Sequence, residues 1–188
     1  MRLLESFFAP LELRSRRERL VLISSAEFAF FVLLLDQGTK LWVEHSFRLH
    51  ESITLVKGWL SLTYVRNTGA AWSILNHQIW LLLIIAILAF GAILYFFHFL
   101  TDRYPERYFA VFLVLSGIMG NSIDRLWRSA VVDFIHVHYR DVWNYPVFNV
   151  ADIAICVGVG IFVLSSFIRP DKKRETQNPA ENENSRNG

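Results

Sequence analysis

Two aspartates in otherwise apolar sequence are the residues best placed to carry out chemistry. Asp133 lies within Val-Val-Asp-Phe-Ile, and Asp152 lies within Phe-Asn-Val-Ala-Asp-Ile-Ala. A charged carboxylate in apolar surroundings is destabilising by several kcal/mol, so such residues usually have a function. Two carboxyl groups that share one proton can act together as general base and general acid on a water molecule. Asp133 and Asp152 are therefore the candidate catalytic pair.

The elements that must position this pair have the composition of a membrane protein. Of the 188 residues, 53% are hydrophobic and 15% are aromatic, which is unusual for a soluble domain. A bilayer core of roughly 30 Å requires about 20 helical residues. We predict a mainly α fold with four transmembrane helices, at about residues 20–42, 79–100, 108–123 and 147–168. Residues 79–100 contain no Asp, Glu, Lys or Arg, which argues against four buried helices of a soluble protein.

Basic residues are concentrated on one side of such a four-helix bundle. The segments on that side carry Arg2, Arg14, Arg16, Arg17, Arg19, Arg103, Arg107, Arg169, Lys172, Lys173, Arg174 and Arg186. Because cytoplasmic segments are enriched in Lys and Arg, both termini are predicted to be cytoplasmic. Residues 1–19 would then form a basic cytoplasmic segment, residues 20–168 the membrane domain, and residues 169–188 a polar, disordered tail.

The two loops at about residues 43–77 and 125–146 should therefore face the extracytoplasmic side. The remaining basic residues lie on or beside these loops: Lys40, Arg48, Lys57, Arg66, Arg125, Arg128 and Arg140. The six tryptophans, which favour a membrane interface, also lie on or beside these loops: Trp42, Trp59, Trp72, Trp80, Trp127 and Trp143.

The outer loops are predicted to form a small β-rich subdomain. Apolar residues alternate at Ile53 and Leu55 and again at Leu60, Leu62 and Tyr64, on either side of a Lys57-Gly58 turn. Period-two spacing around such a turn is typical of a β-hairpin. Residues 131–139, which include Asp133, are rich in β-branched and aromatic residues and are also predicted to be extended.

Three further residue types have alternative interpretations. His136 and His138 together with Asp133 would suggest a metal site, but no spacing typical of metal ligands supports it. The single cysteine, Cys156, lies among apolar residues and is expected to be buried. Glu27 is an acid inside the first predicted span, and its sequence context assigns no function to it.

Polar residues gather near the outer boundary of every predicted span. Asn149 is a candidate N-cap for the last helix, with Asp152 three residues later, so a capping box alone would explain Asp152. Capping does not explain why Asp36, Asn67, Asn121, Asp124 and Asp133 lie near the same boundary. This distribution indicates a functional site, in which the helix start favours a charged Asp152 as the base.

These segments together resemble the lipoprotein signal peptidases, also called type II or prolipoprotein signal peptidases. The matching segments are Asp36-Gln-Gly-Thr-Lys40, Asn67-Thr-Gly-Ala-Ala-Trp-Ser73, Gly120-Asn-Ser-Ile-Asp-Arg125, Val132-Asp-Phe134 and Phe148-Asn-Val-Ala-Asp-Ile-Ala154. They occur in the order found in the family, and five segments in order are a specific match. The resemblance extends over roughly residues 33–168.

The resemblance implies an aspartic endopeptidase whose catalytic residues are Asp133 and Asp152. It implies supporting or substrate-binding roles for Asp36, Lys40, Asn67, Gly69, Asn121, Asp124, Arg125, Asn149 and Ala154. The implied reaction removes the signal peptide from a diacylglyceryl-modified bacterial prolipoprotein, immediately before the lipidated cysteine. No metal or organic cofactor is implied.

The remaining expectations concern partners and rival functions. The implied location is the bacterial inner membrane, with membrane lipid and the prolipoprotein as partners, no nucleic acid, and a monomeric state. Intramembrane carboxylates are equally typical of a small transporter or a proton-conducting protein, which is the main alternative. A non-catalytic assembly factor, whose polar cluster only locks the helices together, is a second alternative.

Overall fold

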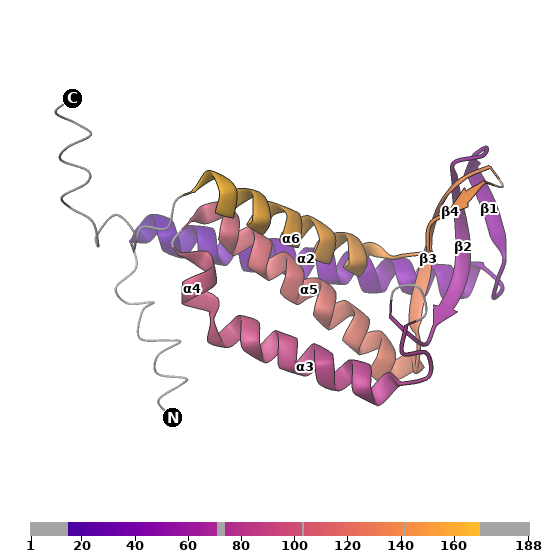
Figure 1. Ribbon diagram of the computed structural model, residues 1–188, viewed down its shortest axis with the longest axis horizontal. Coiled ribbons are helices and arrows are strands. Elements are labelled where there is room, and N and C mark those ends of the chain that lie inside the picture. The colour runs from indigo at the N-terminus through magenta and orange to yellow at the C-terminus, as the bar shows by residue number, and fades with distance from the viewer. Residues whose placement is uncertain (1–14, 71–73, 103, 141, 170–188) are drawn as a thin grey trace.

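Three long helices run side by side, and a small sheet lies across one end of them (Figure 1). The computed structural model describes residues 15–70, 74–102, 104–140 and 142–169. The helices are α2 (Arg16–Ser46), α3 (Ile79–Tyr95), α4 (Phe97–Thr101), α5 (Pro105–Arg128) and α6 (Val150–Ile168). Helix α5 packs against both α2 and α6, whereas α3 runs along the outside of α5.

Three of these helices, α2, α5 and α6, are long and apolar enough to cross a membrane. Helix α3 is equally apolar, but its 17 residues are followed by the short helix α4 after a break at Phe96. The prediction of one continuous helix over residues 79–100 was therefore wrong. The break turns Phe97 inward against Tyr108, with ring centroids 5.8 Å apart, in a cluster that also contains Val111 and Leu115.

Two helices are longer than the sequence predicted. Helix α2 begins at a capping box in which Ser15 and Glu18 exchange hydrogen bonds. Helix α5 continues to Arg128 and ends where Ser129 adopts a left-handed conformation with φ of 56°. The polar segment that was expected to leave the membrane at about residue 125 is thus helical, so the second outer loop begins four residues later.

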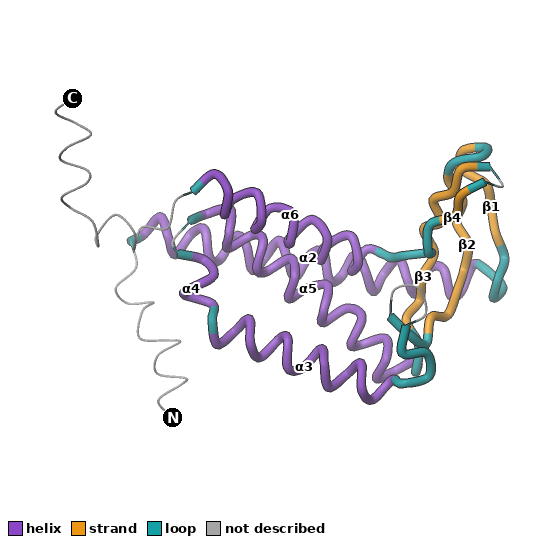
Figure 2. Tube along the Cα trace, viewed as in Figure 1, coloured by secondary structure: helices purple, strands orange, loops and turns teal. Residues whose placement is uncertain are grey.

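The sheet confirms the predicted β-rich subdomain. Strands β1 (Ser52–Val56), β2 (Leu60–Asn67), β3 (Val131–Tyr139) and β4 (Trp143–Asn144) form an antiparallel sheet in the order β1-β2-β3-β4 (Figure 2). Gly58 has φ of 79° in the β1–β2 turn, a conformation that side chains other than glycine rarely adopt. Pairing between β2 and β3 places Asp133 opposite Val65, two residues before Asn67 on β2.

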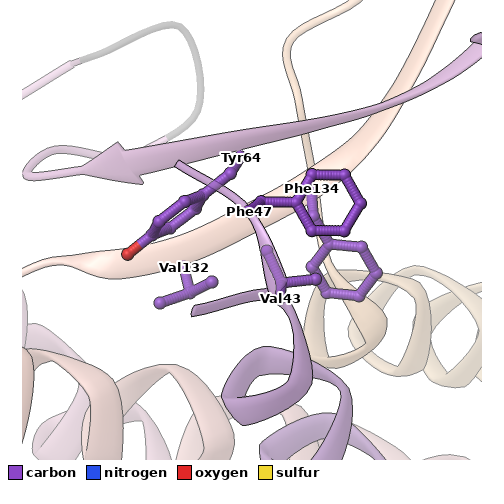
Figure 3. Close-up of a cluster of buried hydrophobic side chains, with 5 residues drawn as sticks. All are labelled: Val43, Phe47, Tyr64, Val132 and Phe134. Carbon is purple, nitrogen blue, oxygen red and sulfur yellow. The ribbon is translucent and has the colours of Figure 1, made fainter. Parts of the chain in front are cut away.

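An apolar cluster joins the end of α2 to the sheet. It consists of Val43, Phe47, Tyr64, Val132 and Phe134, whose side chains meet between the helix and strands β2 and β3 (Figure 3). Truncating a buried phenylalanine to alanine typically destabilises a protein by about 3–5 kcal/mol. Because Val132 and Phe134 flank Asp133 in the chain, this cluster holds the strand that presents Asp133.

Close helix packing fixes the other half of the site. A Cβ atom added at Gly120 of α5 would lie 2.6 Å from Oδ2 of Asp36, and one at Gly158 of α6 would lie 2.6 Å from the carbonyl oxygen of Ala110. Both distances are too short for a real Cβ contact. The glycines therefore allow α2, α5 and α6 to approach closely.

Candidate active site

The candidate pair Asp133 and Asp152 faces one cavity, although β3 and α6 supply the two residues separately. The cavity has a volume of about 340 Å³ and also reaches helices α3 and α5. Its polar lining comes from Asp133, Asp152, Asn67, Gly69, Asn121 and Arg125. Its apolar lining includes Ala86, Ile118, Val131, Val147, Phe148 and Ile155. The site therefore combines two carboxyl groups with a largely apolar wall.

The carboxyl group of Asp133 is buried and receives two amide hydrogen bonds. Nδ2 of Asn67 donates to Oδ2 at 3.1 Å, and Nδ2 of Asn149 donates to Oδ1 at 2.7 Å. Burial and the nearby Asp152 carboxylate raise the pKa of Asp133 to about 7, although the two amide bonds favour the charged form. Asp133 can therefore hold a proton close to neutral pH.

The carboxyl group of Asp152 lies in the first turn of α6. Its backbone N–H donates to Oδ1 of Asn149 at 2.9 Å, and the N–H of Asn149 donates to Oδ2 of Asp152 at 3.1 Å. The capping box that the sequence suggested is thus present. It uses only one carboxylate oxygen, because Oδ1 of Asp152 accepts from Nδ2 of Asn121 at 2.8 Å. Capping and a role in the candidate site are compatible.

Asn149 and Asn121 connect the two carboxyl groups. Besides capping α6, the buried Asn149 donates from Nδ2 both to Asp133 and to Oδ1 of Asn121, the latter at 3.2 Å. Oδ1 of Asn121 also accepts from Nζ of Lys40 at 3.2 Å. An ammonium group only donates and an ionised carboxylate only accepts, so Asn121 must turn its oxygen to Lys40 and its nitrogen to Asp152.

A buried ion cluster supports both halves of the site. Nζ of Lys40, whose side chain is 0% exposed, lies 2.8 Å from Oδ2 of Asp36 and 3.0 Å from Oδ2 of Asp124. Asp124 accepts from the backbone N–H of Val132 at 3.0 Å, and Asp36 accepts from the N–H of Ala151 at 2.8 Å. Each carboxylate thus anchors the residue that immediately precedes one member of the candidate pair.

Among the described residues that line the cavity, Arg125 is the one with a cationic side chain. Its Nη2 donates to the carbonyl oxygen of Gly69 at 3.2 Å, and Nη1 donates to that of Asn121 at 3.4 Å. Its buried Nε has no hydrogen-bond partner within the described part of the chain. Gly69 is held in turn by Asn67, whose Oδ1 accepts from the Gly69 N–H at 2.9 Å. The guanidinium group is therefore placed to bind an acceptor in the cavity.

Ala154 and Cys156 differ in their relation to the cavity. Ala154 is buried in α6 and is not among the described residues that line the cavity. Cys156, which was expected to be buried, is exposed and lines the cavity. The interior face of α6 is occupied by Ala151, Ala154 and Gly158, and Cys156 lies off that face. The expectation for Cys156 was therefore wrong.

His136 and His138 are not among the described residues that line this cavity. His138 Nε2 lies 3.0 Å from Oγ of Ser61, and His136 Nδ1 lies 3.4 Å from Oγ1 of Thr63. Burial and the neighbouring His138 lower the pKa of His136. These contacts tie β3 to β2.

Sequence reasoning did not identify Gln37, Glu44 and Arg128 as part of the site. Gln37 Nε2 donates to Asp36 at 3.0 Å and to Asp124 at 3.2 Å. Arg128 lies 2.8 Å from Asp124 and 2.7 Å from Glu44, extending the ion cluster. The signal was present in the four-residue spacing of Asp124 and Arg128, which places both on one helix face. Glu27 is exposed on α2, and no polar partner is found for it among the described residues.

The chain is similar to known proteins over most of its length. Residues 28–168 match the family model described as signal peptidase (SPase) II. A lipoprotein signal peptidase of Halalkalibacterium halodurans is 42% identical over 154 residues, covering 81% of this chain and 96% of the relative. A lipoprotein signal peptidase of Nitratidesulfovibrio vulgaris is 38% identical over 151 residues, covering 78% and 90%.

Two solved structures are also similar, and both are described as bacterial membrane enzymes. The first has a TM-score of 0.70 and 31% identity, covering 82% of this chain and 90% of the other. The second has a TM-score of 0.66 and 33% identity, covering 76% and 91%. On the family model and these relatives, the chain belongs to the signal peptidase II family, the lipoprotein signal peptidases.

Proposed function

We propose that this chain removes the signal peptide from diacylglyceryl-modified prolipoproteins by aspartic endopeptidase chemistry, cutting before the lipidated cysteine. The observation that carries the catalytic assignment is the meeting of Asp133 and Asp152 on one cavity, bridged by Asn149. Family membership carries the substrate class, since the relatives are lipoprotein signal peptidases. A transporter or proton-conducting role is not favoured by these relatives.

The two aspartates differ in their surroundings, and this difference supports different roles for them. Asp152 receives the Asn121 amide and the Asn149 backbone N–H at a helix start, all of which favour a carboxylate. Asp133, whose pKa is raised to about 7, keeps the proton. The resting pair therefore carries one negative charge and one proton, as two neighbouring carboxyl groups commonly do.

Hydrolysis then needs only the pair and one water molecule. Asp152 accepts a proton from the water as its oxygen attacks the scissile carbonyl carbon, while Asp133 donates its proton to the carbonyl oxygen. The tetrahedral intermediate collapses when the carbon–nitrogen bond breaks. The proton taken by Asp152 passes to the leaving amine of the cysteine, and one hydroxyl group of the intermediate returns a proton to Asp133 as it becomes the new carbonyl. The products are a new carboxyl group on the signal peptide and a free amine on the lipidated cysteine.

The polar groups around the pair would hold the substrate backbone. Arg125 faces the cavity with a guanidinium that already binds the Gly69 carbonyl, and a substrate carbonyl is a matching acceptor. Asn67, Asn121 and Asn149 fix the carboxyl oxygens through amide donors. Because these side chains come from β2, α5 and the start of α6, substrate binding and catalysis share one framework.

We further propose that the chain spans the inner membrane four times, with α3 and α4 together forming the second span and with both termini cytoplasmic. The start of α2 and the end of α6 lie at the end of the bundle opposite the sheet (Figure 1). Exposed tryptophans at the sheet end, Trp42, Trp59, Trp80, Trp127 and Trp143, support an interface there. Trp72 and most of the predicted cytoplasmic arginines and lysines lie outside the described residues. We propose that a monomer suffices, because the described chain contributes both aspartates.

The test is cleavage of a diacylglyceryl-modified prolipoprotein by purified protein in detergent or lipid. Cleavage that yields a lipidated cysteine with a free amine supports the proposal, whereas failure to process this substrate in its modified form contradicts it. EDTA should leave the rate unchanged, because the proposed mechanism uses no metal ion.

A further inference from the structure

A second cavity opens on Asp133 from outside the helix bundle. It has a volume of about 270 Å³ and shares Asn67, Asp133, Pro146 and Val147 with the cavity described above. Its other lining residues are Val65, Arg66, Thr68 and Asn76, and none of its described lining residues belongs to a helix. Asp133 therefore stands between a cavity that reaches three helices and a cavity formed only by the outer strands and loops.

The two cavities differ in chemistry as well as in position. The wall of the first is largely apolar and includes Ala86 of α3, Ile118 of α5 and Ile155 of α6. The second is walled by a guanidinium, a hydroxyl and two amides, from Arg66, Thr68, Asn67 and Asn76. Its volume is many times what a single water molecule requires, so the cavity is larger than a channel that only supplies water to the catalytic pair. A polar chain segment is the natural occupant of such a cleft.

Arg66 lines this cavity and uses only part of its guanidinium group for contacts within the protein. Its Nε donates to the hydroxyl of Tyr64 at 2.9 Å, and its Nη2 donates to Glu44 at 3.1 Å. Nη1 has no hydrogen-bond partner among the residues that the structure describes. Glu44 is shared with Arg128, so one carboxylate serves two guanidinium groups. The side chain is thus fixed in place by two contacts while one nitrogen remains for an acceptor in the cleft.

The proposed substrate has two halves that need different surroundings. The signal peptide and the acyl chains of the cysteine are apolar and belong in the bilayer, which the first cavity adjoins. The chain that follows the cysteine is the start of the mature protein, and it must leave the catalytic pair towards water. Only one of the two cavities at Asp133 is polar and free of helices.

We propose that this second cavity, lined by Arg66, Thr68 and Asn76, binds the polypeptide segment immediately after the lipidated cysteine. The inference rests on the proposed function and adds a subsite for the mature side of the substrate. Arg66 binds main-chain carbonyls or acidic side chains there, and it disfavours basic side chains through like-charge repulsion. Specificity on this side of the scissile bond should therefore follow charge.

The experiment compares synthetic lipidated substrates that share one signal peptide. One series ends directly after the diacylglyceryl cysteine, and the other continues for six residues with either aspartate or lysine at the second and third positions after the cut. Wild-type protein should show a higher kcat/KM for the longer aspartate substrate than for the truncated one. The aspartate substrate should also exceed the lysine substrate by about two- to five-fold, as expected for a partly exposed charge pair.

The variant R66Q removes the charge at the cavity, and R140Q is the matched control. Arg140 is an exposed arginine that stacks on Tyr139 of β3 and lines neither cavity among their described residues. In R66Q the aspartate-to-lysine ratio should fall to about one, while R140Q should keep the wild-type ratio.

Three outcomes separate this inference from the proposed function. Equal kcat/KM of wild-type protein for truncated and extended substrates would overturn the subsite, as would a charge preference that survives in R66Q. These results would leave the peptidase assignment intact, because all substrates would still be cleaved. Loss of cleavage of every substrate by wild-type protein would instead overturn the proposed function. The comparison of aspartate and lysine substrates with wild-type protein tests the subsite even if R66Q folds poorly.

Discussion

Lys40 should control the pH dependence of cleavage through Asn121. Its ammonium group is fully buried, donates to Oδ1 of Asn121 at 3.2 Å, and thereby holds the amide so that Nδ2 donates to Asp152 at 2.8 Å. Removing Lys40 alone would leave Asp36 and Asp124 with too little positive charge, and breaking a buried pair in this way costs about 3–5 kcal/mol of stability. The informative perturbation is therefore the paired substitution Asp36→Asn with Lys40→Met, which removes one charge of each sign. Asparagine at position 36 can still accept from the N–H of Ala151.

The expected size of the effect follows from the hydrogen bonds. A hydrogen bond to a charged group contributes about 1.5–3 kcal/mol, which corresponds to roughly one to two pH units. Asn149 also donates to Oδ1 of Asn121 and retains part of the amide orientation, so the lower end of this range applies. The acidic limb of the rate profile marks the second protonation of the pair. Loss of a donor to the charged form moves that limb to higher pH, by about one unit.

The assay is kcat/KM for a lipidated prolipoprotein between about pH 4 and 9, because this quantity reports the free enzyme. Arg125 and Lys40 are the cations that act on the pair, and Asp36 and Asp124 are bound to Lys40. The paired substitution leaves Arg125 and Asp124 in place. Asn121→Leu should shift the acidic limb in the same direction. Adding the paired substitution to Asn121→Leu should produce little further shift, since the contact through Asn121 is already lost and the direct effect of the Lys40 charge on Asp133 is offset by the loss of the Asp36 charge.

Additive shifts would show instead that Lys40 acts on the pair mainly through its own charge and not through the orientation of Asn121. A thermal unfolding measurement on each variant identifies any loss of rate that comes from unfolding.

Three further predictions concern the proton, the helix contact and the cavity. Wild-type kcat/KM should decline above about pH 7, because Asp133 then loses the proton that it must donate; activity that is constant from pH 6 to 9 would contradict the assignment of Asp133 as the acid. Gly120→Ala should lower stability by about 1–3 kcal/mol and reduce activity, because its Cβ would lie 2.6 Å from Oδ2 of Asp36. Gly160→Ala is the control, since nothing lies within 4 Å of its Cβ. Equal unfolding temperatures of the two variants would be inconsistent with the close helix packing at Gly120. A thiol-reactive reagent should slow cleavage by modifying Cys156, the single cysteine of the chain, which lines the cavity. The variant Cys156→Ala should be resistant to the reagent. An unaffected wild-type rate after complete modification would show that the substrate does not bind in the cavity.

Local signals in the sequence predicted the elements that carry the candidate site. The Lys57-Gly58 turn predicted the β1–β2 hairpin, and Asn149 predicted the start of α6, because turns and caps depend on neighbouring residues only. The apolar runs located the long helices for the same reason. Their ends were less accurate, because Asn121, Asp124, Arg125 and Arg128 resemble a polar loop in sequence. In the structure their spacing of three and four residues turns them inward along one face of α5.

Contacts between distant segments could not be read from the sequence. Asp36 of α2 binds the N–H of Ala151, 115 residues later in the chain, at a point where Gly120 leaves room between the helices. The exposure of Cys156 was missed for a related reason. An apolar residue of a membrane helix can face either protein or lipid, so hydrophobicity alone does not indicate burial against protein.

In the proposed mechanism, Asp133 and Asp152 together activate the water that cuts the prolipoprotein. The most direct measurement compares single-turnover cleavage by wild-type protein, Asp133→Asn and Asp152→Asn. Asp102→Asn, at the far end of the bundle, is the control for the same chemical change. Each variant of the pair should lose at least about a thousandfold in rate, within the range expected for general acid–base catalysis, while its unfolding temperature stays close to that of wild type. Cleavage within about tenfold of the wild-type rate by either folded variant would contradict the account.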